Sequence, residues 1–345
     1  MDYKASGVDI DAGNEAVRRI RGLARSTFTA GVLSDIGSFG GLFRLNAASC
    51  EDPVLVSSAD GVGTKLKVAF MTGRHDTVGA DLVNHCVNDI LVQGAFPLFF
   101  LDYFATGRLS PVVAEAVVSG MAAACRENGC ALLGGETAEM PGLYADGEYD
   151  LAGFIVGVVS RPRLITGERI AAGDVLVGLP SSGLHTNGYS LARQIAFEHL
   201  ALSPAAHVPE LGTTVADAFL APHRSYLPHL RGLIDRDLLK GLAHITGGGI
   251  TENLPRILPP GTMARIDARS WQVPPLFAWL RRGGRVPVED MMRTFNMGIG
   301  LIAVVAADAA DAVVRELSTR LGHGVAIVGD VVSGPQPKVE YVNLS

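Results

Sequence analysis

The chain has 345 residues, more than one hydrophobic core usually organises, and 48% of them are hydrophobic, so two domains are expected. A net charge of −6 without any run of Lys or Arg excludes a polynucleotide-binding surface. The first residues lack the pattern of a signal peptide, and no apolar stretch is long enough to span a bilayer. Because the four cysteines have neither Cys-x-x-Cys nor zinc-site spacing, we expect reduced thiols in a cytoplasmic protein. The charge and the short apolar stretches predict that it contacts neither nucleic acid nor membrane.

Short apolar runs alternate with amphipathic stretches along the chain, which is typical of an α/β or α+β protein. The stretch 110–128 is the best-defined helix, because Ser110 stands at its N-cap, Pro111 in its first turn and Gly129 just past its end. Further helices are expected over residues 14–29, 79–94 and 190–199. Strands are expected over residues 54–56, 97–104, 131–133, 151–159, 175–179, 299–305 and 325–331.

The polar segment 160–173 contains a proline and two glycines and separates two of the expected strands. It predicts the boundary between a first domain over residues 1–165 and a second over residues 166–345. Within the second domain, residues 201–209 are rich in prolines and small side chains, so we expect a surface excursion there.

Residues directly after the first expected strand place a carboxylate, two glycines, a hydroxyl and an ammonium close together: Asp60, Gly61, Gly63, Thr64 and Lys65. Glycine N–H groups can converge on an anion, Lys adds a point charge for phosphate, and Asp is an oxygen ligand suited to Mg²⁺. The spacing matches neither a P-loop nor a Rossmann turn. An ordinary junction between a buried strand and a turn is therefore the alternative to a binding loop.

One face of the expected helix 79–94 is polar without carrying Lys, Arg or Glu. At helical spacing this face holds Asp81, Asn84, His85, Asn88 and Asp89. A face turned to water is the simpler alternative. However, short Asp and Asn side chains are poor helix formers and suit a metal ion or phosphate-bound water, so the pattern favours a binding role.

The next strand is expected to end in two glycines and to carry Glu136, Thr137 and Glu139 at its tip. Carboxylates at strand ends are common ligands of Mg²⁺ or polar substrates. A structural hairpin rich in Gly and Pro remains an equally good interpretation of this segment alone.

The second half has two further glycine-rich segments, each after an apolar run. In residues 178–190, hydroxyls, backbone N–H groups and His185 could surround an anion or a sugar. In residues 244–253, Gly247, Gly248 and Gly249 precede a short helix, and three adjacent glycines are costly to order unless a ligand approaches the backbone closely.

No nucleophile elbow, nucleophilic Cys signature or His-Glu-x-x-His motif is present. Positioning combined with charge stabilisation, as in phosphoryl transfer from ATP, fits the candidate residues better. The remaining histidines without such context are interpreted as surface or packing residues: His75, His199, His207 and His323.

Taken in order, these segments resemble the phosphoribosylformylglycinamidine cyclo-ligase (AIR synthetase) family over nearly the whole chain. The resemblance is carried by residues 3–14, 40–43, 60–67, 81–89, 99–107, 134–142, 180–191, 245–253 and 295–300. It implies a two-domain fold in which strands of the N-terminal ATP-binding domain pair with those of a second subunit, closing a β-barrel across a homodimer. A C-terminal α/β domain then completes the active-site cleft.

The reaction implied by the resemblance belongs to de novo purine biosynthesis. Formylglycinamidine ribonucleotide is closed to 5-aminoimidazole ribonucleotide with ATP, through phosphorylation of the formyl oxygen, and ADP and phosphate are released. A small-molecule nucleotide substrate, ATP and Mg²⁺ are thus the implied ligands.

The resemblance also implies roles for individual residues. The catalytic set is Lys65, Asp89 and His185. The ATP-binding set is Asp60, Gly61, Gly63, Thr64, Lys65, Asp81, Glu136 and Thr137. Substrate would contact Asn84, His185, Asn187, Gly247, Gly248 and Gly249. Mg²⁺ or its water shell would contact Asp60, Asp81, Asp89 and Glu136.

The chain departs from the family pattern at a few places. Ala59 stands where Thr is more usual, residues 34–37 are less glycine-rich, and residues 221–226 replace a Pro-Thr-Arg-type segment. Relatives of the same architecture phosphorylate selenide, thiamine phosphate or carbamoyl groups, or form the ATP-using half of formylglycinamidine synthetase. A non-catalytic nucleotide-binding protein is the alternative of a different class, and the retained acidic residues, Lys65 and His185 argue against it.

Overall fold

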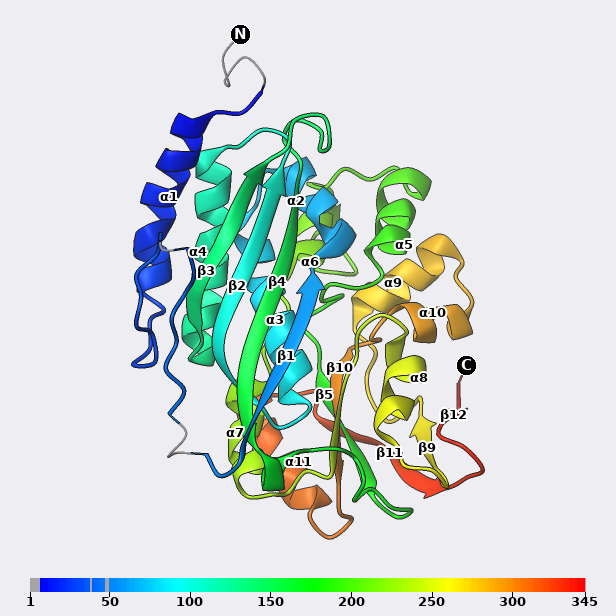
Figure 1. Ribbon diagram of the computed structural model, residues 1–345. Helices are drawn as coiled ribbons and strands as arrows, with labels where there is room; N and C mark the ends of the chain where they lie inside the picture. The colour runs from blue at the N-terminus through cyan, green and yellow to red at the C-terminus, as the bar shows by residue number, and fades with distance from the viewer. Residues whose placement is uncertain (1–6, 38, 47–49, 345) are drawn as a thin grey trace. The chain divides into compact units, whose positions relative to one another are not determined.

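The computed structural model describes residues 7–37, 39–46 and 50–344, which form two compact units (Figure 1). Unit 1 comprises Met1–Ile90 and Ala95–Pro162, and unit 2 comprises Leu91–Gly94 and Arg163–Ser345. The first motif of the family resemblance, residues 3–14, falls partly outside the described residues.

Unit 1 is built on a four-stranded sheet in the order β1 (Pro53–Gly61), β4 (Tyr149–Ser160), β2 (Phe96–Thr106) and β3 (Ala131–Glu139). The β1–β4 and β4–β2 pairs are antiparallel, and β2 and β3 are parallel. Alternate residues of β4 are buried, as expected for a sheet covered on one face. The helices of this unit are α1 (Ile10–Arg25), α2 (Leu66–Thr72), α3 (Asp76–Leu91) and α4 (Pro111–Asn128).

Two of these helices pack against one face of the sheet and cross each other closely (Figure 1). A Cβ on Gly79 of α3 would lie 1.9 Å from the carbonyl oxygen of Val117, and a Cβ on Gly120 of α4 would lie 2.1 Å from that of Asp76. The two backbones are therefore in contact, which only glycine allows. This crossing fixes α3, the helix with the polar candidate residues, against the sheet.

The expected bounds of α4 are confirmed, including Gly129 in the left-handed conformation with φ 64°. Those of α1 are wrong, because Asp9 caps the helix by accepting hydrogen bonds from the amides of Asp11 and Ala12. The helix therefore begins at Ile10, four residues earlier than expected from residue 14, and ends at Arg25. The expected helix 79–94 is also shifted, since α3 begins at Asp76.

Two strands of unit 1 continue through residues that were expected in turns. β1 runs to Gly61, so Asp60 is a strand residue, and a 3₁₀ turn over Gly63–Lys65 leads into α2. β3 runs through its two glycines to Glu139, so Glu136 and Thr137 lie within the strand and not at its tip. The strand is longer than expected because its residues pair with β2 as far as Glu139. A glycine is needed at position 135 because a Cβ there would lie 2.2 Å from a carboxylate oxygen of Asp102 on β2.

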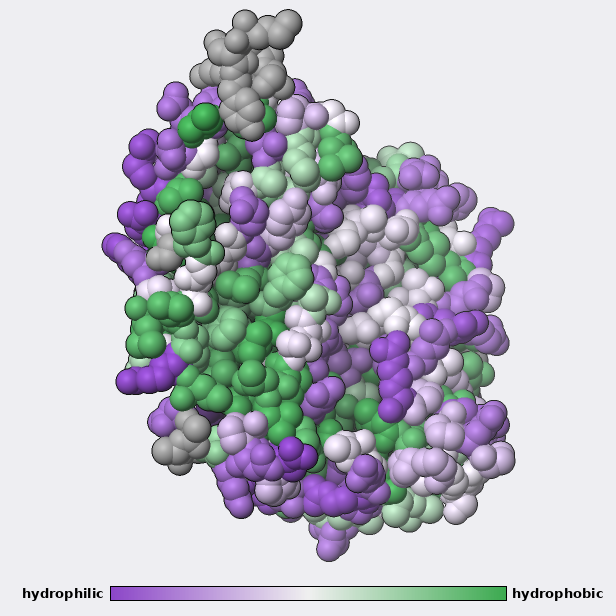
Figure 2. All heavy atoms as spheres, viewed as in Figure 1, coloured by the Kyte–Doolittle hydropathy of each residue, from purple (hydrophilic) through white to green (hydrophobic). Residues whose placement is uncertain are grey.

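The other face of this sheet exposes apolar side chains, as Figure 2 shows for unit 1. Leu55 on β1 is 60% exposed and Phe154 on β4 is 46% exposed. The strand expected over residues 54–56 is part of β1, but the interpretation of this segment as buried is wrong, since only Val56 of the three residues is buried. Val156 and Val158 of β4 lie on the same face, opposite Ser57 and Leu55 in the strand register.

Unit 2 contains a six-stranded sheet in the order β12 (Val339–Val342), β9 (Thr262–Asp267), β11 (Ala326–Ser333), β5 (Val175–Pro180), β10 (Ile299–Val305) and β8 (Gly241–His244). Only the β12–β9 pair is parallel among these. Every residue of β10 is buried, so it forms the centre of the core. A two-stranded ribbon of β6 (His207–Val208) and β7 (Thr213–Thr214) lies near the expected surface excursion.

Seven helices are described in unit 2: α5 (Tyr189–Arg193), α6 (Val215–Leu220), α7 (Leu227–Asp235), α8 (Gly249–Asn253), α9 (Pro275–Gly284), α10 (Val288–Thr294) and α11 (Ala310–Leu321). The expected helix 190–199 consists of α5 followed by a π-helical turn, Gln194–His199. Across both units, none of the described helices combines the length and apolar character that a membrane crossing requires.

Candidate active site

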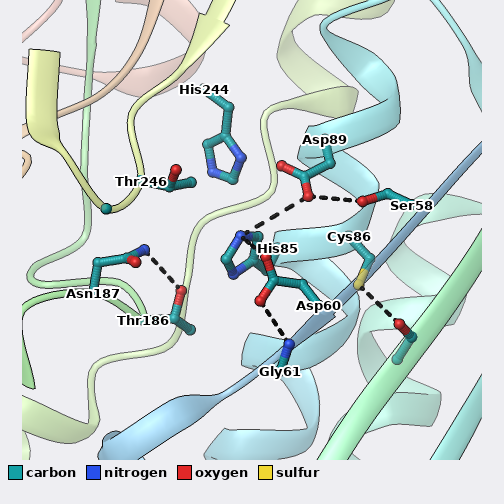
Figure 3. Close-up of polar contacts among 12 residues, drawn as sticks. Ser58, Asp60, Gly61, His85, Cys86, Asp89, Thr186, Asn187, His244 and Thr246 are labelled. Atoms are coloured by element: carbon teal, nitrogen blue, oxygen red, sulfur yellow. Dashed lines mark hydrogen bonds and ion pairs between the residues drawn. The ribbon is translucent and has the colours of Figure 1, made fainter. Parts of the chain in front are cut away.

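The end of β1 and the last turn of α3 bring two of the predicted Mg²⁺ ligands, Asp60 and Asp89, together (Figure 3). The Nε2 atom of His85 lies 3.0 Å from an Asp60 carboxylate oxygen and 4.0 Å from one of Asp89. The Ser58 hydroxyl donates to Asp89 at 3.0 Å, and the Gly61 amide donates to Asp60 at 2.6 Å. Both carboxylates remain accessible, with side chains 43% and 25% exposed, so they offer oxygen ligands at one place.

The charges at this place reinforce one another. Burial lowers the pKa of His85, but the hydrogen bond with Asp60 and the charges of Asp89, Asp60 and Asp81 outweigh burial and raise the pKa above its ordinary value. For Asp60, burial raises the pKa, and the hydrogen bond and charge of His85 outweigh it and lower the pKa. Asp60 and His85 therefore each favour the charged form of the other, the carboxylate and the imidazolium.

Lys65 and Asp81, both predicted to bind ATP, form an ion pair in the interior. Their Nζ and carboxylate oxygen are 2.7 Å apart, and both side chains are 0% exposed. Burial lowers the pKa of Lys65, although the charge of Asp81 works in the opposite direction. The ammonium is thus paired with an internal acid and has no exposed surface through which a phosphate could contact it.

The remaining polar residues of α3 face the interior as well. Asn84 is 5% exposed and accepts a hydrogen bond from the Asn128 amide of α4 at 3.0 Å, while Asn88 is 0% exposed. The apolar side of the helix is also buried, so residues 81–88 of α3 are enclosed on both faces, while Asp89 is partly exposed. The alternative of a face turned to water is therefore wrong.

A cavity of about 620 Å³ lies within unit 1, beside β3. Its polar lining includes Glu136 and Thr137 from the predicted ATP-binding set, together with Asp102 and the glycines Gly37, Gly40, Gly41, Gly134 and Gly135. Its volume is within the range of small-molecule sites. The 3₁₀ turn after β1 holds the other predicted phosphate-binding residues, with Gly63 at φ 65° and Thr64 exposed.

Sequence reasoning missed Asp102, which is the one acid in an otherwise apolar strand pattern at residues 97–104. Burial raises its pKa to about 7, and the charge of Glu136 adds to the effect. The signal that could have found it is the pair of glycines in the neighbouring strand, whose missing side chains leave space for this carboxyl group.

In unit 2, His185 follows β5 and is held in the left-handed conformation at φ 61°. It is 1% exposed, and its Nε2 atom accepts a hydrogen bond from the Ser182 amide at 3.2 Å. Gly300 on β10 makes room for the ring, because a Cβ there would lie 2.5 Å from His185 Cε1. A buried non-glycine residue in this conformation is costly and often marks a functional site.

The three glycines of the second predicted segment have structural explanations of their own. Gly248 and Gly249 have φ values of 94° and 60°, and a Cβ on Gly249 would lie 2.0 Å from the Met292 carbonyl oxygen. Gly247 lies against Asn187, whose side-chain oxygen would be 3.2 Å from its Cβ. The structure thus brings two predicted substrate-binding residues together, from segments 60 positions apart.

The comparisons with known proteins place this architecture in a class. Family models described as "AIR synthase related protein", N-terminal and C-terminal domain, match residues 30–159 and 171–342. Among solved structures, thiamine-monophosphate kinase from Stenotrophomonas maltophilia K279a aligns with a TM-score of 0.67 at 21% identity, over 95% of each chain. The hydrogenase maturation protein HypE in complex with ATP aligns with a TM-score of 0.63 at 18% identity, over 95% of this chain and 90% of that one. The fold is that of the AIR synthase-related proteins.

A curated relative narrows the class. Phosphoribosylformylglycinamidine cyclo-ligase of Trichlorobacter lovleyi is 53% identical over 342 residues, covering 99% of this chain and 98% of the relative. The chain belongs to the phosphoribosylformylglycinamidine cyclo-ligase family. The resemblance, the two-domain α/β fold and the assignment as a ligase are confirmed. ATP-dependent cyclisation of formylglycinamidine ribonucleotide, the predicted reaction, is the reaction of this family.

Proposed function

We propose that this chain closes formylglycinamidine ribonucleotide to 5-aminoimidazole ribonucleotide with ATP and Mg²⁺. The observation that carries the proposal is identity above one half along the whole length of a named cyclo-ligase. A structure of the same fold was solved with ATP, which supports nucleotide binding by this architecture. Thiamine-monophosphate kinase is 21% identical to this chain, so the likeness shows a shared fold and is no argument for thiamine monophosphate as the substrate.

The chemistry requires an amide oxygen to become a leaving group. The formyl oxygen attacks the γ-phosphorus of ATP and ADP departs. A substrate nitrogen then attacks the activated carbon, loses a proton, and expels phosphate with that oxygen, which closes the ring. Holding the nitrogen beside the carbon can supply about 7–11 kcal/mol of the barrier, so the protein mainly positions two phosphorylated molecules and balances charge.

Asp60 and Asp89 are our first candidates for holding Mg²⁺, because both carboxylates reach one accessible place beside His85. Bound there, the ion would neutralise charge on the ATP phosphates. Glu136 and Thr137, at the cavity of unit 1, are assigned to ATP, with Gly61, Gly63 and Thr64 at its phosphates.

We still assign Lys65 and Asp81 to the ATP site, where their buried ion pair would position neighbouring residues of α3. The ammonium holds Asp81 on α3, one turn before Asn84 and His85. In unit 2, we assign His185, Asn187, Gly247, Gly248 and Gly249 to substrate, and in unit 1 Asn84.

We also propose a homodimer in which the exposed face of the unit 1 sheet meets its copy. Leu55 and Phe154 would then leave water, which favours association by about 25 cal/mol per Å² of apolar area. Phe154→Asp should shift the chain to monomers in sedimentation experiments. Ile327→Asp, at a residue 42% exposed on β11, is the matched control and should leave the oligomeric state unchanged. A monomeric wild type would exclude the dimer.

The test of the reaction is phosphate release from ATP with and without formylglycinamidine ribonucleotide, with the ring-closed product measured in parallel. Release and product formation should both depend on that substrate. Asp89→Asn should abolish turnover while the far-UV circular dichroism and melting temperature stay near those of the wild type. Substrate-independent release, or none, would overturn the proposal.

As the family's reaction supplies purines, we place the enzyme in the cytoplasm, in keeping with its free cysteines.

A further inference from the structure

Three histidines of unit 2 gather their imidazole rings in the interior. His185, His223 and His244 are 1%, 1% and 7% exposed, and one ring nitrogen of each lies within 4.8 Å of the others. The three candidate ligand atoms of this group are all ring nitrogens. This donor set differs from the oxygen ligands at Asp60 and Asp89.

The fold of unit 2 holds the three rings in place from three separate segments. His244 is the last residue of β8 and pairs with Leu301 of β10, while His185 follows β5 on the other side of β10. His223 lies between α6 and α7. On β10, the missing side chain of Gly300 leaves the space that the His185 ring fills.

Contacts among the rings show how close the nitrogens already are. The Nε2 atoms of His223 and His244 are 3.1 Å apart, with their rings inclined at 60°. The rings of His185 and His223 are stacked at 21°, with centroids 4.0 Å apart. Outside the cluster, the Ser182 amide is bonded to His185 Nε2, and the Thr186 hydroxyl is 3.4 Å from His223 Nδ1. Because these outer contacts involve the other nitrogen of each ring, His185 Nδ1 and His223 Nε2 are the candidate ligand atoms.

We propose that His185, His223 and His244 bind one divalent transition-metal ion. Imidazole nitrogens select Zn²⁺, Co²⁺, Ni²⁺ or Cu²⁺ over Mg²⁺, and three histidines leave a fourth position for water or another ligand. Tetrahedral bonds of about 2.0–2.1 Å put ligand nitrogens about 3.3 Å apart, close to the separation of His223 and His244. The His185 ring has to turn out of its stack to present Nδ1.

His223 lies in residues 221–226, between α6 and α7. One consequence does rest on the proposed function: because His185 is assigned to substrate, a bound ion and the substrate exclude each other, and the ion inhibits.

Titration of chelator-treated full-length protein with Co²⁺ tests the site, in excess Mg²⁺ so that oxygen-ligand sites are already filled. We expect one Co²⁺ per chain with the intense visible absorption of a tetrahedral nitrogen-ligated ion. His223→Asn and His223→Thr should each lose that band. His207→Asn, an exposed histidine on β6, is the matched control and should keep it.

Zn²⁺ added afterwards should displace the bound Co²⁺ and remove the band in the wild type. Absence of the band in wild-type protein, or its persistence in both folded His223 variants, would overturn the proposal. Cyclisation activity is measured separately. Activity without the band refutes only the metal site, and the band without activity refutes only the proposed reaction.

Discussion

The buried polar groups of the two units are stabilised in different ways. In unit 1, the ammonium of Lys65 and the carboxylate of Asp81 have opposite charges and no contact with water. In unit 2, the His185 ring stacks on that of His223, and His223 and His244 share one hydrogen bond between their Nε2 atoms. Removing one member of the charged pair leaves the other as an unpaired buried charge. The histidine cluster depends instead on the space that Gly300 leaves for the His185 ring. Substitutions in the two units should therefore fail for different reasons.

The largest effect should follow from Lys65→Met, which leaves Asp81 buried without the ammonium. We expect the free energy of unfolding to fall by about 3–5 kcal/mol, measured by urea denaturation. The double variant Lys65→Met/Asp81→Leu removes both charges and should recover most of the loss. Equal stability of the single and double variants would show that the charges are not what this pair contributes.

Gly300→Ala tests the steric dependence of the histidine cluster. The new Cβ would lie 2.5 Å from His185 Cε1 and 2.0 Å from the Tyr226 hydroxyl oxygen, and overpacking of this kind costs about 1–3 kcal/mol. Urea denaturation measures the loss. Gly232→Ala on α7, where the nearest atoms are 3.7 Å away, is the control and should lose nothing. An unchanged Gly300→Ala variant would show that the space around His185 is adaptable.

Asp102 differs from both groups, because this half-buried acid of unit 1 lies beside another acid, Glu136. Its pKa is raised from 3.8 to about 7, so the folded state binds a proton more tightly than the unfolded state. This contribution to stability is therefore lost as the pH rises from about 4 to about 7. A shift of this size would be worth about 4 kcal/mol in full, and the partial exposure of Asp102 reduces it. Asp102→Asn should therefore be more stable than the wild type by about 1–2 kcal/mol at pH 8 and equal to it at pH 4, by denaturation at both values. No pH-dependent difference would refute the raised pKa.

The smallest effect should be a change in the titration of His85. Its pKa is raised above 6.5 because the hydrogen bond with Asp60 and neighbouring charges outweigh burial, so its stabilisation is full below pH 6.5 and is lost as the pH rises through the folded value. Asp60→Asn removes the main opposing group and should lower the pKa, as followed by the NMR signal of the ring. Ser58→Ala removes a hydrogen-bond partner of Asp89 but not of His85, so the pKa of His85 should stay higher in this variant than in Asp60→Asn. An unaltered titration in Asp60→Asn would assign the raised pKa to the other acids.

Much of the architecture was predictable from local signals. The helix α4 is marked by Ser110, Pro111 and Gly129, and the core strand β10 by an unbroken apolar run, so both agree with expectation. Three strands of the unit 2 sheet were not expected, since β8 and β12 have only four residues each and β9 is interrupted by Arg265. Short segments such as these are stabilised mainly by their neighbours in the sheet, which local patterns do not identify.

The candidate site was predictable in its residue types but not in its pairings. The polar face of α3 was identified, yet nothing local indicated that Asp81 would pair with Lys65 while Asn84 met Asn128. Such pairings depend on which elements pack together. The glycines of β3 suggested a turn, whereas their role is to leave space for Asp102, a residue of another strand.

The contact between α3 and α4 has a consequence for how the chain can evolve. At Gly79 and Gly120 an added methyl group would meet main-chain atoms, and main chain cannot be replaced by a compensating mutation nearby. In a saturation library these two positions should accept no other amino acid. Gly13 and Gly22 of α1, where nothing lies within 4 Å, should accept alanine readily. Among the helical glycines of unit 1, Gly79 and Gly120 should thus tolerate no substitution, whereas Gly13 and Gly22 should tolerate alanine.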